Sequence, residues 1–290
     1  MASLRSDQAE GLRRLLERSA LRVLSIGAAA GGASGAVLNL AAALAESGSE
    51  VLILDAQPAG RGVAAALGLN PRFDLEDVIA RRRDLDEVIT RAPGGVLILP
   101  LARGVGPIAR LPAREQQRLI ERCGRLGYPV DTLLIDAGAG GALTPLWPDR
   151  AARETIVLAG ASAAAITSAY ALIKQLANEH ARREFHLLVG EVANETEART
   201  IFANMAGAAR RYLQVRLDFM GHVPADEKLR QAARLRLPVV TAFPRSAAAT
   251  GFRRLARAID AWPRTDAEGC GFDEFMRRFI HSNSPPAAAA

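Results

Sequence analysis

The sequence predicts an α/β fold: a doubly wound, mostly parallel β-sheet flanked by helices. Short apolar runs alternate with helical patterns over most of the chain, which favours strand–helix–strand units. Several of these runs are continuously apolar, as strands covered on both faces of a parallel sheet are. The chain has 290 residues, 49% of them hydrophobic, so it is long and apolar enough to bury such a sheet.

The expected elements follow one another along residues 21–262. We expect strands at Arg22–Ile26, Val51–Leu54, Val96–Pro100, Thr132–Asp136, Thr155–Ala159, His186–Glu191, Leu217–Val223 and Val239–Ala242. We expect helices at Val37–Glu46, Glu115–Leu126, Ala163–Ala181, Glu195–Tyr212, Glu227–Leu235 and Ala247–Ala261. Ligands of doubly wound sheets bind at the carboxyl ends of the strands. This rule places the loop at 27–34, Asp55 and Asp136 along one edge.

Two further segments flank this central part. Residues 1–20 are polar with a small apolar stripe, which predicts an N-terminal helical arm. Residues 263–290 contain a polar linker, a short amphipathic helix and a Ser-Pro-Pro-Ala tail with the composition of a disordered segment. The sequence therefore predicts three parts, at 1–20, 21–262 and 263–290.

The composition limits the cellular locations and the kinds of binding partner that we expect for this chain. No apolar run reaches the roughly 18 residues that a membrane span needs, and the N-terminus has no apolar signal-peptide core. Cys123 and Cys270 stand far apart and form no metal-type spacing, which favours a reduced cytoplasm. The net charge of +6 favours anionic partners, or reflects only an arginine-rich composition. No basic stretch is interleaved with aromatic residues, so direct nucleic-acid binding is not expected.

Residues 25–55 have the layout of a phosphate-binding loop. An apolar strand runs into a Gly/Ala-rich loop and a serine, followed by a helix and a second strand that ends at Asp55. In this layout backbone N–H groups and a helix N-terminus cradle phosphate. The loop nevertheless has no lysine, because the two lysines of the chain, Lys174 and Lys228, are far away in sequence. The pattern leaves open whether this is a working nucleotide site or the remains of one.

Several stretches, spread along nearly the whole chain, match the sequence motifs of one family. They are DQAEGLRRLL at 7–16, LNLAAALAESGSEVLILDA at 38–56, LLIDAGAG at 133–140, ITSAYALIKQL at 166–176 and FDEFMRRFI at 272–280. They resemble the MinD/ParA group of deviant P-loop ATPases and, within it, the flagellar-number regulators FlhG and FleN. The resemblance implies a MinD-like P-loop NTPase fold, ATP or ADP with Mg²⁺ as ligand, and a role in flagellum number or placement.

The loop departs from the family's GKGGxGK[ST] pattern. Aligned without gaps, that pattern falls on Gly27, Ala28, Ala29, Ala30, Gly31, Gly32, Ala33 and Ser34. The deviant lysine then falls on Ala28 and the phosphate-clamping lysine on Ala33. A second register pairs Gly31 and Gly32 with the family's double glycine, but no register supplies a lysine. Arg61 and Arg103 are the arginines that we consider as substitutes.

Other positions of the implied nucleotide site are also altered. The family's second acid after the second strand, which positions the attacking water, is replaced by Gln57. Its adenine-reading asparagine falls on Gly190, while Asp226 keeps the acid of a Pro-x-Asp segment. Ser34 and Asp136 are the implied Mg²⁺ ligands if nucleotide binds. The implied, degenerate nucleotide site thus consists of Gly27, Ala28, Gly31, Gly32, Ala33, Ser34, Asp55, Asp136, Gly190 and Asp226.

The missing lysines predict weak or absent ATPase activity. Each charge-assisted contact contributes about 1.5–3 kcal/mol, so losing two weakens binding by roughly 10²- to 10⁴-fold if the terms add. Transfer of the phosphoryl group depends further on charge stabilisation and on a positioned water. We therefore expect no confident catalytic residue and a regulator that works through partners. The alternative is an active MinD-like ATPase that switches between a cytosolic monomer and a membrane-bound dimer.

The N-terminal segment is the expected partner-binding element. In the resembled family it stimulates an SRP-type GTPase, FlhF, which places Asp7, Gln8, Ala9, Leu12 and Arg13 in that role. A glutamine on a helix can orient an attacking water at a neighbour's γ-phosphate. A flagellar transcription activator, flagellar switch proteins and a second copy of the chain are further implied partners. The alternative is an arm whose leucines dock on its own core.

The C-terminal segment carries an apolar helical face. Five residues at i, i+3, i+4, i+7 and i+8 share it: Phe272, Phe275, Met276, Phe279 and Ile280. Such a helix can lie in a membrane interface, where the arginines on its other face favour anionic lipid. The pattern alone fits equally well a face packed against its own domain. The resemblance favours membrane binding, and hence a cytoplasmic protein in peripheral contact with the inner face of the cell membrane.

Overall fold

The computed structural model describes residues 21–28, 32–58, 60–101, 103–108, 110–138, 154–263 and 271–283. The expectations for the N-terminal segment (Asp7, Gln8, Ala9, Leu12 and Arg13), for Gly31 and for the tail at 284–290 concern residues outside these ranges.

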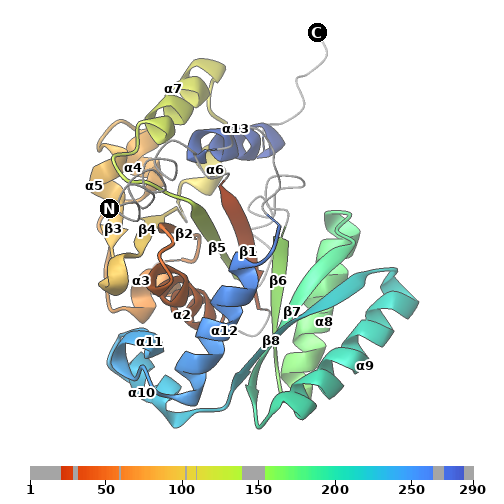
Figure 1. The fold of residues 1–290 in the computed structure, drawn as a ribbon. Helices are drawn as coiled ribbons and strands as arrows, with labels where there is room; N and C mark the ends of the chain where they lie inside the picture. The colour runs from red at the N-terminus through yellow and green to blue at the C-terminus, as the bar shows by residue number, and fades with distance from the viewer. Residues whose placement is uncertain are drawn as a thin grey trace, which may run out of the picture.

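The described residues form one eight-stranded sheet (Figure 1). Its strands are β1 (Arg22–Gly27), β2 (Val51–Asp55), β3 (Thr90–Arg91), β4 (Leu97–Pro100), β5 (Thr132–Gly138), β6 (Glu154–Gly160), β7 (Glu184–Val192) and β8 (Arg216–Pro224). Their order is β3-β4-β2-β5-β1-β6-β7-β8, and every neighbouring pair is parallel except β3 with β4. The predicted doubly wound, mostly parallel sheet is confirmed.

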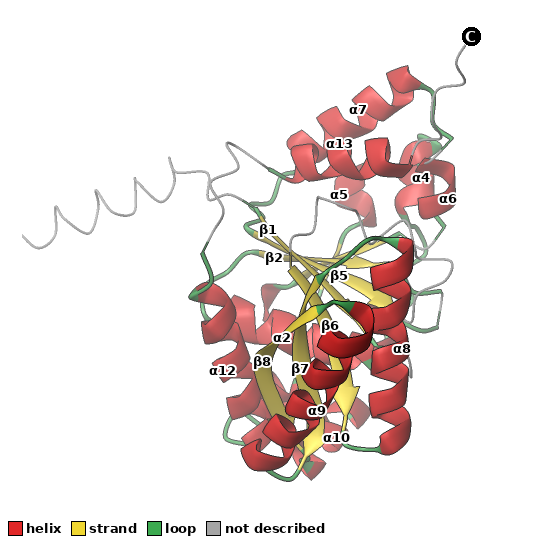
Figure 2. Cartoon of the chain, turned by 90° about the vertical axis from the view of Figure 1, so that its right-hand side faces the viewer, coloured by secondary structure: helices red, strands yellow, loops and turns green. Residues whose placement is uncertain are grey.

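Helices cover both faces of this sheet. They are α2 (Ala33–Glu46), α3 (Val63–Ala66), α4 (Leu75–Ile79), α5 (Leu85–Val88), the 3₁₀ turn η1 (Pro93–Gly95), α6 (Val105–Ile108), α7 (Ala113–Gly124), α8 (Ala163–Glu179), α9 (Glu195–Leu213), α10 (Glu227–Arg234), α11 (Val239–Ala242), α12 (Ala247–Asp260) and α13 (Phe272–Asn283). One core joins the sheet to α7, α8, α9 and α13, and the other joins it to α2, α11 and α12. Figure 2 shows α2 and α12 on one side of the sheet and α8 on the other.

Strand alternation explains the two cores. In β2, Leu52 and Leu54 pack into the core with α7 and α13, whereas Val51 and Ile53 pack into the core with α2 and α12. Successive side chains of a strand point to opposite faces, so a strand buried on both sides must be apolar throughout. The continuous apolar runs of the sequence therefore identified these strands correctly.

One predicted strand is wrong. Val239–Ala242 is the short helix α11, not a strand. Pro238 begins this turn, and Val239 donates its backbone N–H to Oδ1 of Asn39 at 2.6 Å. A four-residue apolar run has the same pattern whether it forms a buried strand or a buried helical turn. The nearby proline and the contact with α2 select the helix here.

The C-terminal helix α13 packs on its own domain, beside α7 (Figure 1). Phe272, Phe275, Met276, Phe279 and Ile280 are all at most 5% exposed. The rings of Phe275 and Phe279 stack with centroids 6.0 Å apart. The face that we expected to bind a membrane is therefore covered by the protein in this structure, which is the alternative that the pattern left open. Within the described ranges, no helix is both long and apolar enough to cross a membrane.

Candidate functional site

The candidate site lies at the carboxyl ends of the central strands, where the sequence placed it. β5 lies between β1 and β2, so its Asp136 pairs in register with Ile26 on one side and with Asp55 on the other. Both aspartates are buried, with Asp136 at 0% and Asp55 at 5% exposure. The loop that begins at Gly27 leaves from the same edge. The structure thus brings Gly27, Asp55 and Asp136 together.

Asp136 is held by two neutral groups. The hydroxyl of Ser34, in the first turn of α2, donates to its Oδ2 at 2.5 Å. The side-chain amide of Gln57 donates to its backbone oxygen at 3.3 Å and contacts its Oδ1 at 3.5 Å. No lysine or arginine among the described residues forms a salt bridge with it. Burial, together with the nearby charge of Asp55, raises the pKa of Asp136 to about 7, even though the Ser34 bond favours its charged form.

Asp55 organises the loop that follows β2. Its Oδ2 accepts the backbone N–H of Ala64 at 2.9 Å, and its Oδ1 accepts that of Gln57 at 3.2 Å. Gly62, with a φ of 85°, lies so close that a Cβ there would stand 2.2 Å from Oδ1. Burial raises the pKa of Asp55, although these N–H groups oppose the rise. Its contacts show a structural role, in which the carboxylate fixes the chain at the start of α3.

Gln57 occupies the place where the resemblance implies an acid. It packs over Gly138, whose φ is 61° and where a Cβ would lie 2.1 Å from the Gln57 amide nitrogen. Because the amide donates to Asp136, it stabilises that carboxylate. A glutamine side chain has no carboxylate with which to accept a proton from water. In this structure Gln57 therefore acts as a hydrogen-bond donor to Asp136.

The loop positions of the two implied lysines carry methyl groups. Ala28 and Ala33 are 4% and 3% exposed, so these methyl groups pack into the protein. Helix α2 begins at Ala33 after Gly32, which is left-handed with a φ of 85°, and no side chain caps its first turn. The helix N-terminus still offers N–H groups to an anion, but the described part of the loop offers no cationic side chain.

A pocket of about 440 Å³ adjoins this loop. The predicted residues Ala28, Gly32, Gly190 and Asp226 all line it, beside the ends of β6, β7 and β8. Gly190 has no side chain to read a base. Asp226 is the N-cap of α10, and its two oxygens accept N–H groups from Lys228 at 2.8 Å and Ala248 at 2.9 Å. Of the predicted residues in this pocket, Asp226 alone has a polar side chain, and both of its oxygens already accept backbone N–H groups.

Asn39, which the sequence pattern did not predict as a site residue, also lines this pocket. Its side-chain amide donates to the Gly35 oxygen at 2.8 Å, and its Oδ1 accepts the N–H of Val239. A buried polar residue in the apolar face of a helix was the only signal that could have pointed to it.

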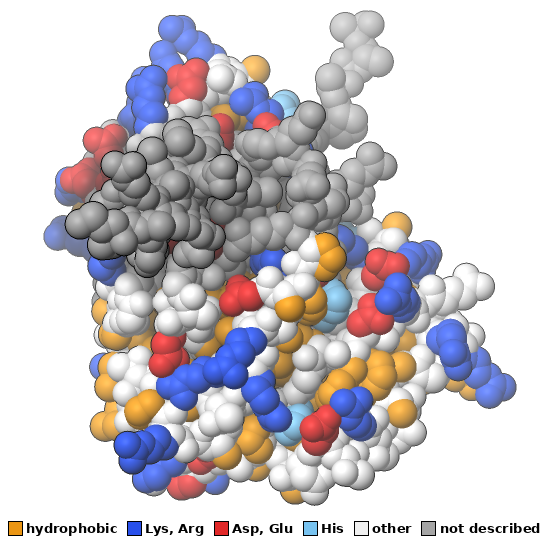
Figure 3. Space-filling model, in the orientation of Figure 1, with side chains coloured by type: hydrophobic (Ala, Val, Ile, Leu, Met, Phe, Trp, Pro, Cys, Tyr) orange, Lys and Arg blue, Asp and Glu red, His pale blue; other side chains and the backbone are white. Residues whose placement is uncertain are grey.

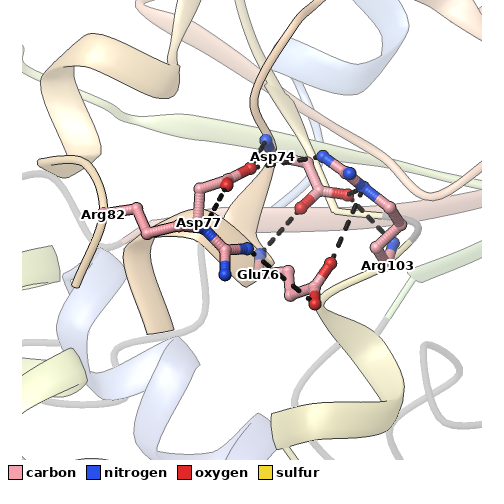
Figure 4. Close-up of polar contacts among 5 residues, drawn as sticks. All are labelled: Asp74, Glu76, Asp77, Arg82 and Arg103. Atoms are coloured by element: carbon pink, nitrogen blue, oxygen red, sulfur yellow. Dashed lines mark hydrogen bonds and ion pairs between the residues drawn. The ribbon is translucent and has the colours of Figure 1, made fainter. Parts of the chain in front are cut away.

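A second acidic and basic cluster was also missed. Asp74 is the N-cap of α4 and Asp77 lies in its first turn, and both are buried. Nε of Arg103 binds Asp74 Oδ2 at 2.8 Å, its Nη2 binds Asp77 Oδ2 at 3.2 Å, and Nε of Arg82 binds Asp77 Oδ1 at 2.8 Å (Figure 4). The Asp-x-x-Asp spacing of a capping box was its signal in the sequence.

The contacts of this cluster show whether Arg103 is available as a substitute for the missing lysines. The side-chain hydrogen bond and charge of Asp74 raise the pKa of Arg103, and its guanidinium bridges the two aspartates. Hydrogen bonds from the Asp74 N–H and from Arg82 hold the pKa of Asp77 below its usual value. Arg103 is therefore engaged in the fold of α4 and is not free to reach the loop.

The donor set suits Mg²⁺ only in part. Ser34 and Asp136 supply the hydroxyl and carboxylate oxygens that this ion prefers, and they already touch each other. The described residues of the loop supply no cationic side chain for the phosphates that would complete its shell. Within the described ranges, no group of three or more His, Cys, Asp or Glu side chains could hold a metal by itself.

Comparisons with known proteins identify a family and two flagellar relatives. Residues 31–239 match the model of the CobQ/CobB/MinD/ParA nucleotide-binding domain. The chain is 34% identical over 243 residues to the antiactivator FleN of Pseudomonas aeruginosa, covering 84% of this chain and 87% of FleN. It is 24% identical over 208 residues to the flagellum site-determining protein YlxH of Helicobacter pylori, covering 71% and 69%.

Solved structures show the same fold. The MinD cell division protein of Aquifex aeolicus superposes with a TM-score of 0.62 at 21% identity, covering 83% of this chain and 98% of that one. MinD of Pyrococcus horikoshii, solved with Mg-ADP, superposes with a TM-score of 0.59 at 20% identity, covering 83% and 96%.

Proposed function

This chain belongs to the CobQ/CobB/MinD/ParA family of nucleotide-binding domains, and we propose that it regulates flagellar number or placement by binding protein partners, with weak or absent ATPase activity. The likeness to FleN over 84% of the chain supports the flagellar role. The observation that carries the weak activity is the pair of buried methyl groups at Ala28 and Ala33, the positions onto which the resembled family's lysines fall. Beside them, the side chains that contact Asp136, those of Ser34 and Gln57, are neutral.

The chemistry of the site supports this reading. A triphosphate bound at the loop brings several negative charges beside two buried aspartates. In a phosphoryl-transferring enzyme, lysine and a metal ion neutralise such charge as it shifts to the leaving oxygen. Ser34 keeps an oxygen lone pair for a metal while it donates to Asp136, but Ala28 and Ala33 supply no cation for the phosphates, and Gln57 has no carboxylate with which to hold the attacking water. Both phosphate binding and transfer are therefore weakened.

The N-terminal segment is the proposed activator of an SRP-type GTPase. Its Asp7, Gln8 and Arg13 match the resembled family's motif, and this role needs no ATP hydrolysis by the chain itself. Restraint of a flagellar transcription activator, contacts with flagellar switch proteins and homodimerisation belong to the same proposal. On the face shown in Figure 3, basic side chains lie scattered among acidic and apolar ones, which suits protein partners better than a nucleic-acid backbone.

Three measurements test the proposal. Calorimetric titration of the full chain with Mg-ATP should give a dissociation constant in the millimolar range or no heat, and phosphate release should stay at the level of the buffer. The full chain should raise the turnover of the partner GTPase, Gln8→Ala should abolish that rise, and Glu10→Ala, two residues away, should keep it.

The competing function is an active ATPase that cycles between a cytosolic monomer and a membrane-bound dimer. The family membership favours it, because relatives bind nucleotide. Micromolar Mg-ATP binding with measurable turnover establishes this alternative and overturns the weak-ATPase proposal. A GTPase unaffected by the full chain overturns the proposed partner role.

A further inference from the structure

A second pocket, of about 530 Å³, adjoins the loop that follows β2. It is formed by the segment between α3 and α4, by the ends of β2 and β4 and by the turn after α10. Four arginines line it, Arg61, Arg72, Arg103 and Arg236, against two acids, Asp55 and Asp74. Its lining has no residue of the loop at 27–34, so it is distinct from the pocket described above.

Both acids of this pocket are already engaged. The two oxygens of Asp55 accept the N–H groups of Ala64 and Gln57. Asp74 accepts the N–H of Glu76 with Oδ1, and its Oδ2 binds Arg103. These carboxylates are therefore turned toward the protein's own donors, and they neutralise only Arg103.

The other three arginines keep their charge available. Arg61, Arg72 and Arg236 are exposed, and none of them forms a salt bridge with a described residue. The guanidinium of Arg72 lies 5.6 Å from the centre of the Phe73 ring, a contact that orients it without neutralising it. Three cationic groups from separate segments thus face one cavity.

The fold places Arg236 in this cavity by a specific contact. Arg236 follows α10 with a φ of 59°, and Gly68 follows α3 with a φ of 66°. A Cβ on Gly68 would lie 2.3 Å from Nη1 and 2.4 Å from Cδ of Arg236. The arginine side chain therefore lies flat against a position that only glycine leaves open. This contact brings a charge from residue 236 to a pocket otherwise built from residues 55–103.

We propose that this arginine pocket binds a small phosphorylated molecule through Arg61, Arg72 and Arg236. Guanidinium groups bind phosphate oxygens in pairs of parallel hydrogen bonds, and arginine is never neutral at physiological pH. The volume falls in the range of pockets for ligands of mononucleotide size. Several arginines converging on one cavity suit a ligand with more than one phosphoryl group. Such a site would hold phosphate away from the lysine-free loop.

Pyrophosphate is the probe that tests this site. Calorimetric titration into the full chain at low salt should show one site per chain. Arg72→Gln and Arg236→Gln should each weaken it about 10- to 100-fold, the effect of losing one charge-assisted hydrogen bond. Arg236→Lys should restore part of the affinity. Arg234→Gln, an exposed arginine two residues away, is the matched control, and Ser34→Ala tests the loop; both should leave binding unchanged.

Three outcomes overturn the inference. Wild-type protein that takes up no pyrophosphate at millimolar concentration has no such site. Equal losses in Arg234→Gln and Arg236→Gln show general attraction by a positive chain rather than a pocket. Loss in Ser34→Ala with none in the arginine variants assigns the phosphate to the loop. The thermal unfolding midpoints of the arginine variants should equal that of the wild type. Equal midpoints show that the binding measurements compare folded proteins.

Discussion

The hydroxyl of Ser34 donates a hydrogen bond of 2.5 Å to the carboxylate of Asp136, so two groups suited to a metal ion lie in direct contact. Asp136 comes from the end of the central strand β5 and Ser34 from the first turn of α2. Ala28 and Ala33 carry buried methyl groups, and no lysine or arginine of the described residues forms a salt bridge with Asp136 or Asp55. We therefore expect the electrostatics of the loop to oppose a triphosphate, and added cations to reverse this.

Restoring the lysines should strengthen nucleotide binding. Each of Ala28→Lys and Ala33→Lys adds one charge-assisted contact, which is expected to tighten Mg-ATP binding by roughly 10- to 100-fold. Calorimetric titration measures the change. Ala45→Lys, near the far end of α2, adds the same charge away from the loop and is the control. If Ala33→Lys and Ala45→Lys bind Mg-ATP equally, something other than the missing cation limits the site.

The sequence predicted the part of this site that follows from strand ends. Gly27, Asp55 and Asp136 each end or follow an apolar run, and parallel strands bring such positions to one edge. The Arg103–Asp74–Asp77 cluster was not predictable in this way, because its arginine is 26 or more residues from its partners in the chain. The short helices between residues 63 and 108 were missed because four- and five-residue helices show little periodicity.

The amphipathic pattern of the sequence predicted which side chains share a helix face, but it did not predict what packs against that face. The apolar face of α13 was predicted residue by residue, yet the pattern fitted a membrane and a protein core equally well. In the structure α7 and the sheet cover this face, and both lie far from α13 in the sequence. The strand prediction for Val239–Ala242 was wrong for a related reason. The contact of Val239 with Asn39 joins residues 200 positions apart, which a local pattern does not reveal.

Asp136 should make the protein less stable as the pH rises. Its pKa is about 7 in the folded protein against an ordinary value of 3.8. Between these values the folded protein keeps a proton that the unfolded chain has lost, so the free energy of unfolding falls with rising pH, by at most about 1.4 kcal/mol per pH unit. Burial raises the pKa of Asp55 as well, which adds a change of the same sign. Urea unfolding at pH 5, 6, 7 and 8 measures it.

Asp136→Asn should flatten this dependence, because asparagine keeps an oxygen for Ser34 but does not titrate. The difference in unfolding free energy between the two proteins should therefore shift in favour of the variant from pH 5 to pH 8. Asp86→Asn, at an exposed position, should run parallel to the wild type over the same range. Parallel curves for wild type and Asp136→Asn would mean that this carboxyl is ionised throughout.

Gln57→Glu should destabilise the protein above neutral pH. The amide donates to Asp136, whereas a glutamate there places a third carboxylate beside Asp55 and Asp136 and cannot donate. Losing the donor and adding repulsion should cost about 1–3 kcal/mol of unfolding free energy at pH 8, and less at pH 5. Gln117→Glu, on the exposed face of α7, is the control for the added charge. A Gln57→Glu protein as stable as Gln117→Glu at pH 8 would contradict the donor role.

Membrane binding by α13 should require the helix to leave α7. Burial of its five apolar side chains contributes at most roughly 7–15 kcal/mol to the stability of the folded protein. The same face cannot contact lipid while it is packed against α7. A Cβ on Gly124 of α7 would lie 3.4 Å from the Cβ of Asp273 on α13, close to disulfide geometry. Gly124→Cys with Asp273→Cys, in a chain whose Cys123 and Cys270 are alanine, should lock the two helices together when oxidised.

Flotation with anionic liposomes compares the oxidised and reduced forms of this locked variant. The reduced protein should float like the same chain without the two added cysteines, and the oxidised protein should float at least tenfold less, because the apolar face stays covered. A chain lacking residues 270–290 is the negative control. Equal flotation of both forms places the lipid contact on another surface. Flotation of neither form means that α13 belongs to the core of the domain, where its phenylalanines support α7 and the sheet.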